Sequence, residues 1–263
     1  MSSCPTCGTD VKSDRLRCPG CGAINLTEGA PISDESVALC DVVSAEHDRV
    51  QTGPWDICFG GESKNLGIVR TSATLLGGSP GAGKSTLVLQ IANQADGEVI
   101  YLAAEESLPE IKSRADRLGI THQKNIRMVS ALSGANLAAV IESRPVKPKM
   151  AIIDSLQGLV GEDDALQLEI CKRAKQFAVA LGCPFLIISH VTKSDVLAGR
   201  LTLQHAVDTT MTFFPDVELT EDNEPLRCLD VMKNRFGAAH VKCYFRMTKN
   251  GLVYVPDDII RGE

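Results

Sequence analysis

The sequence predicts an α/β fold with a mainly parallel central sheet, preceded by a small module that contains four cysteines. Short apolar runs predict buried strands, and longer segments typical of helices lie between them. The runs are SATLL, VIYLAA, KMAIID and CPFLIISHV, and the helical segments include STLVLQIANQA and residues 163–181. Strands that alternate with helices build a parallel sheet through right-handed crossovers.

Composition supports one full-sized domain beside a small module. The chain has 263 residues, of which 44% are hydrophobic but only 4% aromatic, so aliphatic side chains must fill the core. The net charge of −6 gives no basic field overall, so a nucleic acid would have to meet a local basic surface. No apolar run approaches about eighteen residues, and the N-terminus lacks a signal-peptide pattern. We therefore expect a soluble cytoplasmic protein without membrane contact.

Four clustered cysteines predict a structural zinc site. They form two CxxCG pairs separated by ten residues, Cys4 with Cys7 and Cys18 with Cys21. Four thiolates close a tetrahedral site and leave no position for water, which is typical of structural zinc. A disulfide pair or a chance pattern are the alternatives. The six scattered cysteines are expected to be reduced and buried: Cys40, Cys58, Cys171, Cys183, Cys228 and Cys243.

The stretch GGSPGAGKST predicts a phosphate-binding loop. It meets the pattern GxxxxGK[ST] and lies between a predicted strand and a predicted helix, the context that separates a true P-loop from a glycine-rich turn without ligand. Lys84 is expected to reach the β and γ phosphates of ATP, and Ser85 to place a hydroxyl on Mg²⁺. The residues predicted to bind ATP are Gly78, Ser79, Pro80, Gly81, Ala82, Gly83, Lys84, Ser85 and Thr86.

Acidic residues follow two of the predicted strands. Glu105 and Glu106 end VIYLAAEE, where a carboxylate can orient and deprotonate an attacking water. Alternatively, these acids start the next helix, for which Ser107 and Glu110 form a capping box. Glu105, which we expect to be last on the strand, is the better catalytic candidate. Asp154 ends the strand of KMAIID and fits a carboxylate that holds Mg²⁺, or else a solvated strand end.

Two further positions are candidates for contact with phosphate. His190 ends CPFLIISH, where it is either an ordinary strand-end histidine or a sensor of the γ-phosphate. In KNRFG, Lys233 and Arg235 are separated by one residue at a strand end and point to the same face. Two cations side by side favour an anion such as a phosphate, and a solvated turn is the alternative.

KNRFG resembles the signature of the RadA/Sms family, bacterial DNA-repair ATPases of the RecA-like superfamily. The resemblance covers roughly residues 1–255 and follows the order of the family's motifs. The other matching motifs are the four-cysteine ribbon, TG at Thr52–Gly53, GGSPGAGKSTL, AEES, IIDSLQ, SHVTK at Ser189–Lys193 and LQHAVD at Leu203–Asp208.

This resemblance implies an ATP-driven, helicase-like motor that binds single-stranded or branched DNA and promotes branch migration. Family members form hexameric rings with ATP between subunits, so Lys233 and Arg235 would act on the neighbour's ATP as an arginine finger does. A monomer would then be a poor ATPase. The implied partners include a RecA-type recombinase or a replication protein, which the zinc ribbon would contact if it does not contact DNA.

Three features depart from the family. The family continues into a domain resembling the Lon protease, whereas this chain stops at Glu263, and the ribbon lacks the usual W-x-G. The expected first DNA loop, after Asp154, is acidic and would repel phosphate. The second loop, from Lys193 to His205, carries Lys193 and Arg200 and is the better candidate for DNA, with an ordinary mobile loop as the alternative.

The motifs divide the chain into a zinc ribbon at 1–28, a linker or arm at 29–50, a RecA-like ATPase domain at 51–255 and a tail at 256–263. Two other functions remain open. One is a KaiC-like ATPase or autokinase that switches protein partners. The other is a non-catalytic module in which ATP only stabilises an oligomer.

Overall fold

The chain divides by its internal contacts into two compact units, Met1–Glu46 and His47–Glu263. The computed structural model describes residues 2–3, 9–11, 39–41, 46–62, 65–131, 137–190, 201–216 and 226–256. In the first unit, β1 (Ser2–Ser3) pairs antiparallel with β2 (Asp10–Val11), and a 3-10 turn, η1, spans Leu39–Asp41. The four zinc-candidate cysteines lie outside the described residues.

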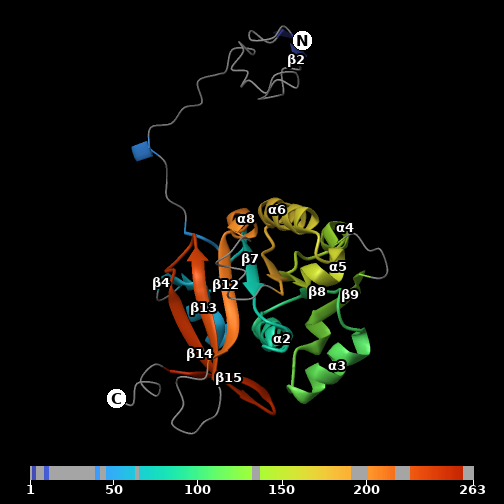
Figure 1. The fold of residues 1–263 in the computed structure, drawn as a ribbon, viewed down its shortest axis with the longest axis vertical. Coiled ribbons are helices and arrows are strands. Elements are labelled where there is room, and N and C mark those ends of the chain that lie inside the picture. The colour runs from blue at the N-terminus through green and yellow to red at the C-terminus, as the bar shows by residue number, and fades with distance from the viewer. Residues whose placement is uncertain are drawn as a thin grey trace. The chain divides into compact units, whose positions relative to one another are not determined.

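One nine-stranded sheet organises the second unit (Figure 1). Its strands lie in the order β15-β14-β13-β12-β7-β11-β10-β8-β9. The six strands from β12 to β9 are mutually parallel, and β13, β14 and β15 continue the sheet as an antiparallel meander. Their bounds are β7 Ala73–Gly77, β8 Val99–Ala103, β9 Ile126–Ser130, β10 Met150–Asp154, β11 Phe185–Ile188, β12 Thr209–Asp216, β13 Leu226–Asn234, β14 Val241–Thr248 and β15 Gly251–Val255.

Helices cover both faces of this sheet. Side chains of α2 and α3 join one hydrophobic cluster, and side chains of α4, α5, α6 and α8 join the other. The helices are α1 Asp56–Phe59, α2 Lys84–Gln94, α3 Leu108–Arg117, α4 Leu137–Glu142, α5 Leu156–Val160, α6 Asp164–Leu181 and α8 Leu201–Ala206, with 3-10 turns η2 Gly53–Trp55 and η3 Gln123–Asn125. None of the helices that the structure describes has the length and apolar character needed to cross a bilayer. The predicted α/β fold with a mainly parallel sheet is confirmed.

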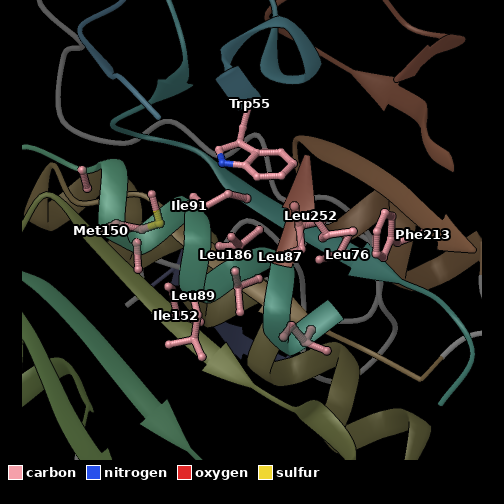
Figure 2. Packing of buried hydrophobic residues seen from close by; sticks show 14 of the residues in the cluster. Trp55, Leu76, Leu87, Leu89, Ile91, Met150, Ile152, Leu186, Phe213 and Leu252 are labelled. Carbon is pink, nitrogen blue, oxygen red and sulfur yellow. The ribbon is translucent and has the colours of Figure 1, made fainter. Parts of the chain in front are cut away.

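The larger cluster packs α2 against the sheet (Figure 2). Leu87 and Ile91 of α2 face Leu186 of the sheet, and all three are almost fully buried. Trp55 closes this core near the N-terminal end of the unit, and its ring centroid lies 4.6 Å from that of Phe245. Aliphatic residues therefore fill most of the core, as the low aromatic content predicts, together with a few deeply buried rings such as those of Tyr101, Phe213 and Phe245.

Short pairings join the start of this unit to its core. Two-residue strands pair antiparallel as β3 with β6 and β4 with β5. Their bounds are β3 Arg49–Val50, β4 Gly61–Glu62, β5 Asn65–Leu66 and β6 Ile68–Val69. The chain is thus already part of the folded unit at Arg49, within the predicted arm.

Candidate active site

The P-loop joins the end of β7 to the start of α2, because glycine backbones let the chain turn tightly there. Gly78, Gly81 and Gly83 have φ values of 151°, 76° and 104°. A Cβ on Gly78 would lie 2.2 Å from the carbonyl oxygen of Phe213, so only glycine fits at that position. The helix then begins at Lys84, and its N-terminal amides can face an anion.

Lys84 lies inside this loop. Its Nζ donates hydrogen bonds to the carbonyl oxygens of Gly78 at 2.7 Å and Ser79 at 3.0 Å, and the residue is only 5% exposed. Burial lowers its pKa, while the nearby carboxylates of Glu105 and Asp154 act in the opposite direction. The ammonium is therefore held by the loop itself, in position to meet phosphate oxygens.

Asp154 and Ser85 meet at the carboxyl ends of the strands. Asp154 ends β10, is 4% exposed and accepts hydrogen bonds from the Tyr101 hydroxyl at 2.5 Å and from Ser85. Burial raises the pKa of Asp154, and these hydrogen bonds oppose that rise. One hydroxyl and one carboxylate, completed by water and phosphate oxygens, form a donor set that Mg²⁺ accepts, so these residues fit the predicted magnesium site.

Glu105 lies in a hydrogen-bonded network with residues that follow two other strands, β10 and β11. Its Oε2 accepts from Ser155 Oγ at 3.0 Å and lies 2.9 Å from His190 Nε2. Gln157 joins the same network, since its side-chain oxygen accepts from the His190 backbone N–H at 3.0 Å and its amide nitrogen lies 3.3 Å from Ser189 Oγ. The structure thus brings the predicted Glu105 and His190 together, and adds Ser155 and Gln157, which the sequence analysis missed.

A cavity of about 320 Å³ lies over the P-loop. It is lined by Pro80, Gly81, Gly83, Lys84, Ser85, Thr86, Glu105, Glu106, Arg114, Arg117, His190 and Met247. Arg114 and Arg117 were not predicted to belong to the site. Their three-residue spacing on a helix was the available signal, because such residues share one face.

Glu106 takes a different partner from Glu105. Arg114 grips its carboxylate with two hydrogen bonds, Nη1 to Oε2 at 2.5 Å and Nη2 to Oε1 at 2.6 Å. Helix α3 itself starts with the predicted capping pair, in which Glu110 accepts from the backbone N–H and hydroxyl of Ser107. Glu106 therefore lies in an ion pair on the cavity wall rather than acting only as a charge at the helix start.

Lys233 and Arg235 lie at the other end of the strands. Lys233 Nζ donates to the carbonyl oxygens of Gln204 and Val207, both at 2.7 Å, near the end of α8. The Arg235 backbone N–H bonds to the carbonyl of Asp208, whose own N–H bonds to Ala73 at the start of β7. The P-loop follows the opposite end of β7, about 13 Å further along the strand. Both cations are absent from the described residues that line the cavity.

The predicted DNA-binding residues Lys193 and Arg200 lie outside the described residues, as do the zinc-candidate cysteines. The end of the second predicted loop is helical, since α8 begins at Leu201. In the acidic first loop, Asp163 caps α6 by accepting from the backbone N–H groups of Ala165 and Leu166, each at 3.0 Å. Within the part of the chain that the structure describes, no group of three His, Cys, Asp or Glu side chains is arranged to hold a metal ion.

Comparisons with known proteins agree with this geometry. Residues 60–258 match the family described as "ATPase: KaiC". The curated DNA repair protein RadA of Bacillus subtilis is 31% identical over 291 residues, covering 99% of this chain and 61% of that protein. RadA of Treponema pallidum is 32% identical over 279 residues, and the match covers 97% of this chain and 58% of the Treponema protein.

The fold also resembles a solved structure. A KaiC-like protein from Pyrococcus horikoshii superposes with a TM-score of 0.61 at 17% identity, covering 80% of this chain and 100% of that one. The chain spans about three fifths of the length of the curated relatives it matches. The RecA-like fold and the P-loop thus agree with an ATPase that uses ATP and Mg²⁺. The chain belongs to the KaiC family of ATPases and is RadA-like within it.

Proposed function

We propose that this ATPase is a DNA-dependent motor of recombination and repair, which hydrolyses ATP between the subunits of a ring and moves on single-stranded DNA. The observation that carries the proposal is the separation of Lys233 and Arg235 from the chain's own P-loop, in a chain similar to DNA repair proteins named RadA. Cations at that end lie about 13 Å along β7 from the chain's own P-loop, so a nucleotide that they contact would belong to another subunit. Branch migration or unwinding would follow from such movement.

Within one subunit, each group around the cavity has a proposed role. Lys84 and the P-loop amides hold the phosphates, while Ser85 and Asp154 would hold Mg²⁺, whose charge would offset that of the phosphates. Glu105 orients the attacking water and accepts its proton. His190, 2.9 Å from Glu105, links this carboxylate to the γ-phosphate. These roles need the close approach of β8, β10 and β11 that the sheet provides.

Between subunits, Arg235 and Lys233 stabilise the charge that develops on the neighbour's γ-phosphate. A cation that enters from the neighbour makes turnover depend on assembly, and an arginine finger is worth about 10³- to 10⁵-fold in rate. A hexameric ring meets this requirement. An isolated monomer should turn over slowly, although its P-loop and Glu105 are complete.

The remaining assignments concern partners. Cys4, Cys7, Cys18 and Cys21 are proposed to hold one structural zinc, because four thiolates in two CxxC pairs suit a closed tetrahedral site. Lys193 and Arg200 are the proposed contacts to DNA, since the neighbouring loop after Asp154 is acidic. A RecA-type recombinase or a replication protein is the proposed protein partner, and the cytoplasm the proposed location.

The deciding experiment measures ATP turnover of the zinc-loaded chain with and without single-stranded DNA, over a range of protein concentrations. Turnover per chain should rise with both DNA and protein concentration. Lys84→Ala is the matched control, and it should abolish turnover while thermal unfolding stays close to that of the wild type. Turnover that does not depend on DNA would contradict the proposal that the protein moves on DNA. Unchanged turnover in Lys84→Ala would contradict the assignment of the ATP site.

The family match favours a second function, because the matching family is described as "ATPase: KaiC". A KaiC-like autokinase would transfer the γ-phosphate to a serine or threonine of the protein. Mass spectrometry after incubation with ATP would detect this phosphate, and Lys84→Ala supplies the negative control. Tight ATP binding with neither phosphate release nor phosphorylation would instead indicate a non-catalytic oligomeric module.

A further inference from the structure

Asp208 is a buried carboxylate at the base of β7 that is shared by two cations. The residue is 3% exposed, and its Oδ2 accepts a hydrogen bond from the Ala73 backbone N–H at 3.2 Å. Its Oδ1 lies 2.7 Å from Lys175 Nζ of α6 and 3.6 Å from Arg235 Nη1. One oxygen thus serves a lysine and an arginine that come from different parts of the fold.

The two cations are held unequally. The distance to Lys175 is that of a charge-assisted hydrogen bond, whereas the distance to Arg235 exceeds hydrogen-bonding range. The side chain of Arg235 is also the more exposed, at 53% against 31% for Lys175. Removing the partner of a buried ion is strongly destabilising. Asp208 would keep its partner Lys175 if the Arg235 guanidinium moved away.

Lys233 does not share this freedom. Its three donors can serve three acceptors, and two of them already meet the carbonyls of Gln204 and Val207. Moving its ammonium would leave these carbonyls, at the end of α8, without that donor. Of the two cations in KNRFG, Arg235 is therefore the one that can move at low cost.

We propose that Lys175 is a positioning residue that keeps Arg235 releasable, by neutralising Asp208 when the Arg235 guanidinium moves onto a phosphate in the neighbouring subunit. Asp208 holds the arginine near the edge of the sheet between turnovers, and Lys175 weakens that hold. The inference rests on the proposed action of Arg235 in trans. It adds a residue from α6, 60 positions away in the sequence, to the machinery of the trans-acting arginine.

Mixed rings test this proposal. Full-length Arg235→Ala subunits keep a P-loop but supply no arginine, and Lys84→Ala subunits supply the arginine but have a defective P-loop. The two variants are prepared as separate pools of subunits. Each pool alone should turn over ATP slowly, and mixing the two pools should restore turnover if Arg235 acts in trans. Lys175→Gln is then added to one pool at a time. Lys172→Gln is the matched control, an exposed lysine one turn earlier on the same helix.

Lys175→Gln in the Lys84→Ala subunits should lower the restored kcat by roughly twofold to fivefold, because Asp208 then loses its nearest cation and holds Arg235 more tightly. KM for ATP should stay the same, since the P-loops that work belong to the other subunits. Lys175→Arg should recover most of the loss. In the Arg235→Ala subunits the same substitution should leave kcat unchanged, because they have no arginine to release.

The outcomes separate the two ideas. If mixing restores no turnover, the proposal that Arg235 acts in trans is wrong, and the proposed role of Lys175 is wrong as well. If mixing restores turnover but Lys175→Gln lowers kcat equally in both pools, or in neither, Arg235 acts in trans and Lys175 does not position it. Equal loss in Lys172→Gln would likewise overturn the role of Lys175.

Discussion

The three carboxylates at the carboxyl ends of β8 and β10 differ in their partners, and this difference separates their roles. Glu105 contacts Ser155 and His190, Glu106 is paired with Arg114, and Asp154 is buried beneath Tyr101 and Ser85. Glu105 is the most accessible, with 44% of its side chain exposed. An exposed carboxylate without a bound arginine is suited to a water molecule, and a buried one to a metal ion.

Glu105→Gln tests this division. We expect turnover to fall at least about 100-fold, because the amide cannot accept the proton of the attacking water. Binding of ATP should persist, since the amide keeps the shape of the side chain and the P-loop is untouched. Turnover and nucleotide affinity measured on the same preparation check this. Equal loss of binding and turnover would contradict a role for Glu105 in the chemical step.

Asp154→Asn should stabilise the protein in the absence of Mg²⁺ and nucleotide. Burial raises the pKa of Asp154 above its ordinary value of 3.8, so the folded state binds this proton more tightly than the unfolded state does. The contribution of Asp154 to stability therefore falls as pH rises through the raised pKa, and the ionised carboxylate is a cost at neutral pH.

Thermal unfolding at several pH values measures this effect. The stability difference between Asp154→Asn and the wild type should shrink as pH falls, and the variant should lose its activation by Mg²⁺. A wild type more stable than the variant at pH 7 without Mg²⁺ would show that the hydrogen bonds from Tyr101 and Ser85 outweigh burial.

The sequence was sufficient to predict that Lys84, Ser85, Glu105 and Asp154 lie close together, because each has a fixed place relative to a strand end or a P-loop pattern. Carboxyl ends of parallel strands gather at one edge, so local patterns specify a shared site. The pair Lys175–Asp208 could not be predicted this way. Its partners are 33 residues apart and meet only because α6 packs beside the start of β7.

Among the elements, the short helix α5 sets the position of the Glu105 network. It follows directly after Asp154 and carries Gln157, while Ser155 precedes it as N-cap. Gly158 lets this helix approach the end of β8, because a Cβ there would lie 2.6 Å from the carbonyl atoms of Ala104 and 2.9 Å from the Glu105 nitrogen. The helix thus rests on the backbone that carries Glu105.

Gly158→Ala should separate α5 from that backbone. We expect a loss of about 1–3 kcal/mol in stability, as for other overpacked sites, together with a lower kcat because the contact between Ser155 and Glu105 lengthens. Gly161→Ala is the matched control, since its positive φ of 63° strains an alanine while no atom lies within 4 Å of the new Cβ. The control should lose stability without a comparable fall in kcat.

Thermal unfolding and steady-state turnover, measured on both variants, make this comparison. A Gly158→Ala protein with normal kcat would show that α5 does not control the position of Glu105. Equal falls in kcat for the two variants would instead attribute the effect to general destabilisation.

At the scale of the whole molecule, the two compact units imply separate stabilities. The sequence predicts that metal holds the first unit together, whereas the second has its own hydrophobic core on both faces of the sheet. Strands β9 and β12 of this core were missed by the sequence analysis. The first is only partly buried, and the second carries polar threonines along a buried run, so neither gives a continuous apolar signal.

Cys18→Ser tests this separation. It should remove zinc from the protein, leaving about one equivalent per chain only in the wild type, because a structural site needs all four thiolates. The unfolding of residues 47–263 should stay unchanged, since the four cysteines belong to the other compact unit. Metal analysis and thermal unfolding check both results. A wild-type chain without bound zinc, or a large loss of stability in that unit, would contradict the assignment.

Arg49 connects the N-terminal end of the second unit to the turn that carries Arg235. Its guanidinium binds the carbonyl oxygens of Gly60 at 3.1 Å, Gly67 at 2.7 Å and Phe236 at 2.7 Å. Phe236 follows Arg235 directly, so one side chain ties the chain's entry point to the turn that carries this arginine. Because one guanidinium joins all three carbonyls, a displacement of β3 would be felt at the turn that carries Arg235.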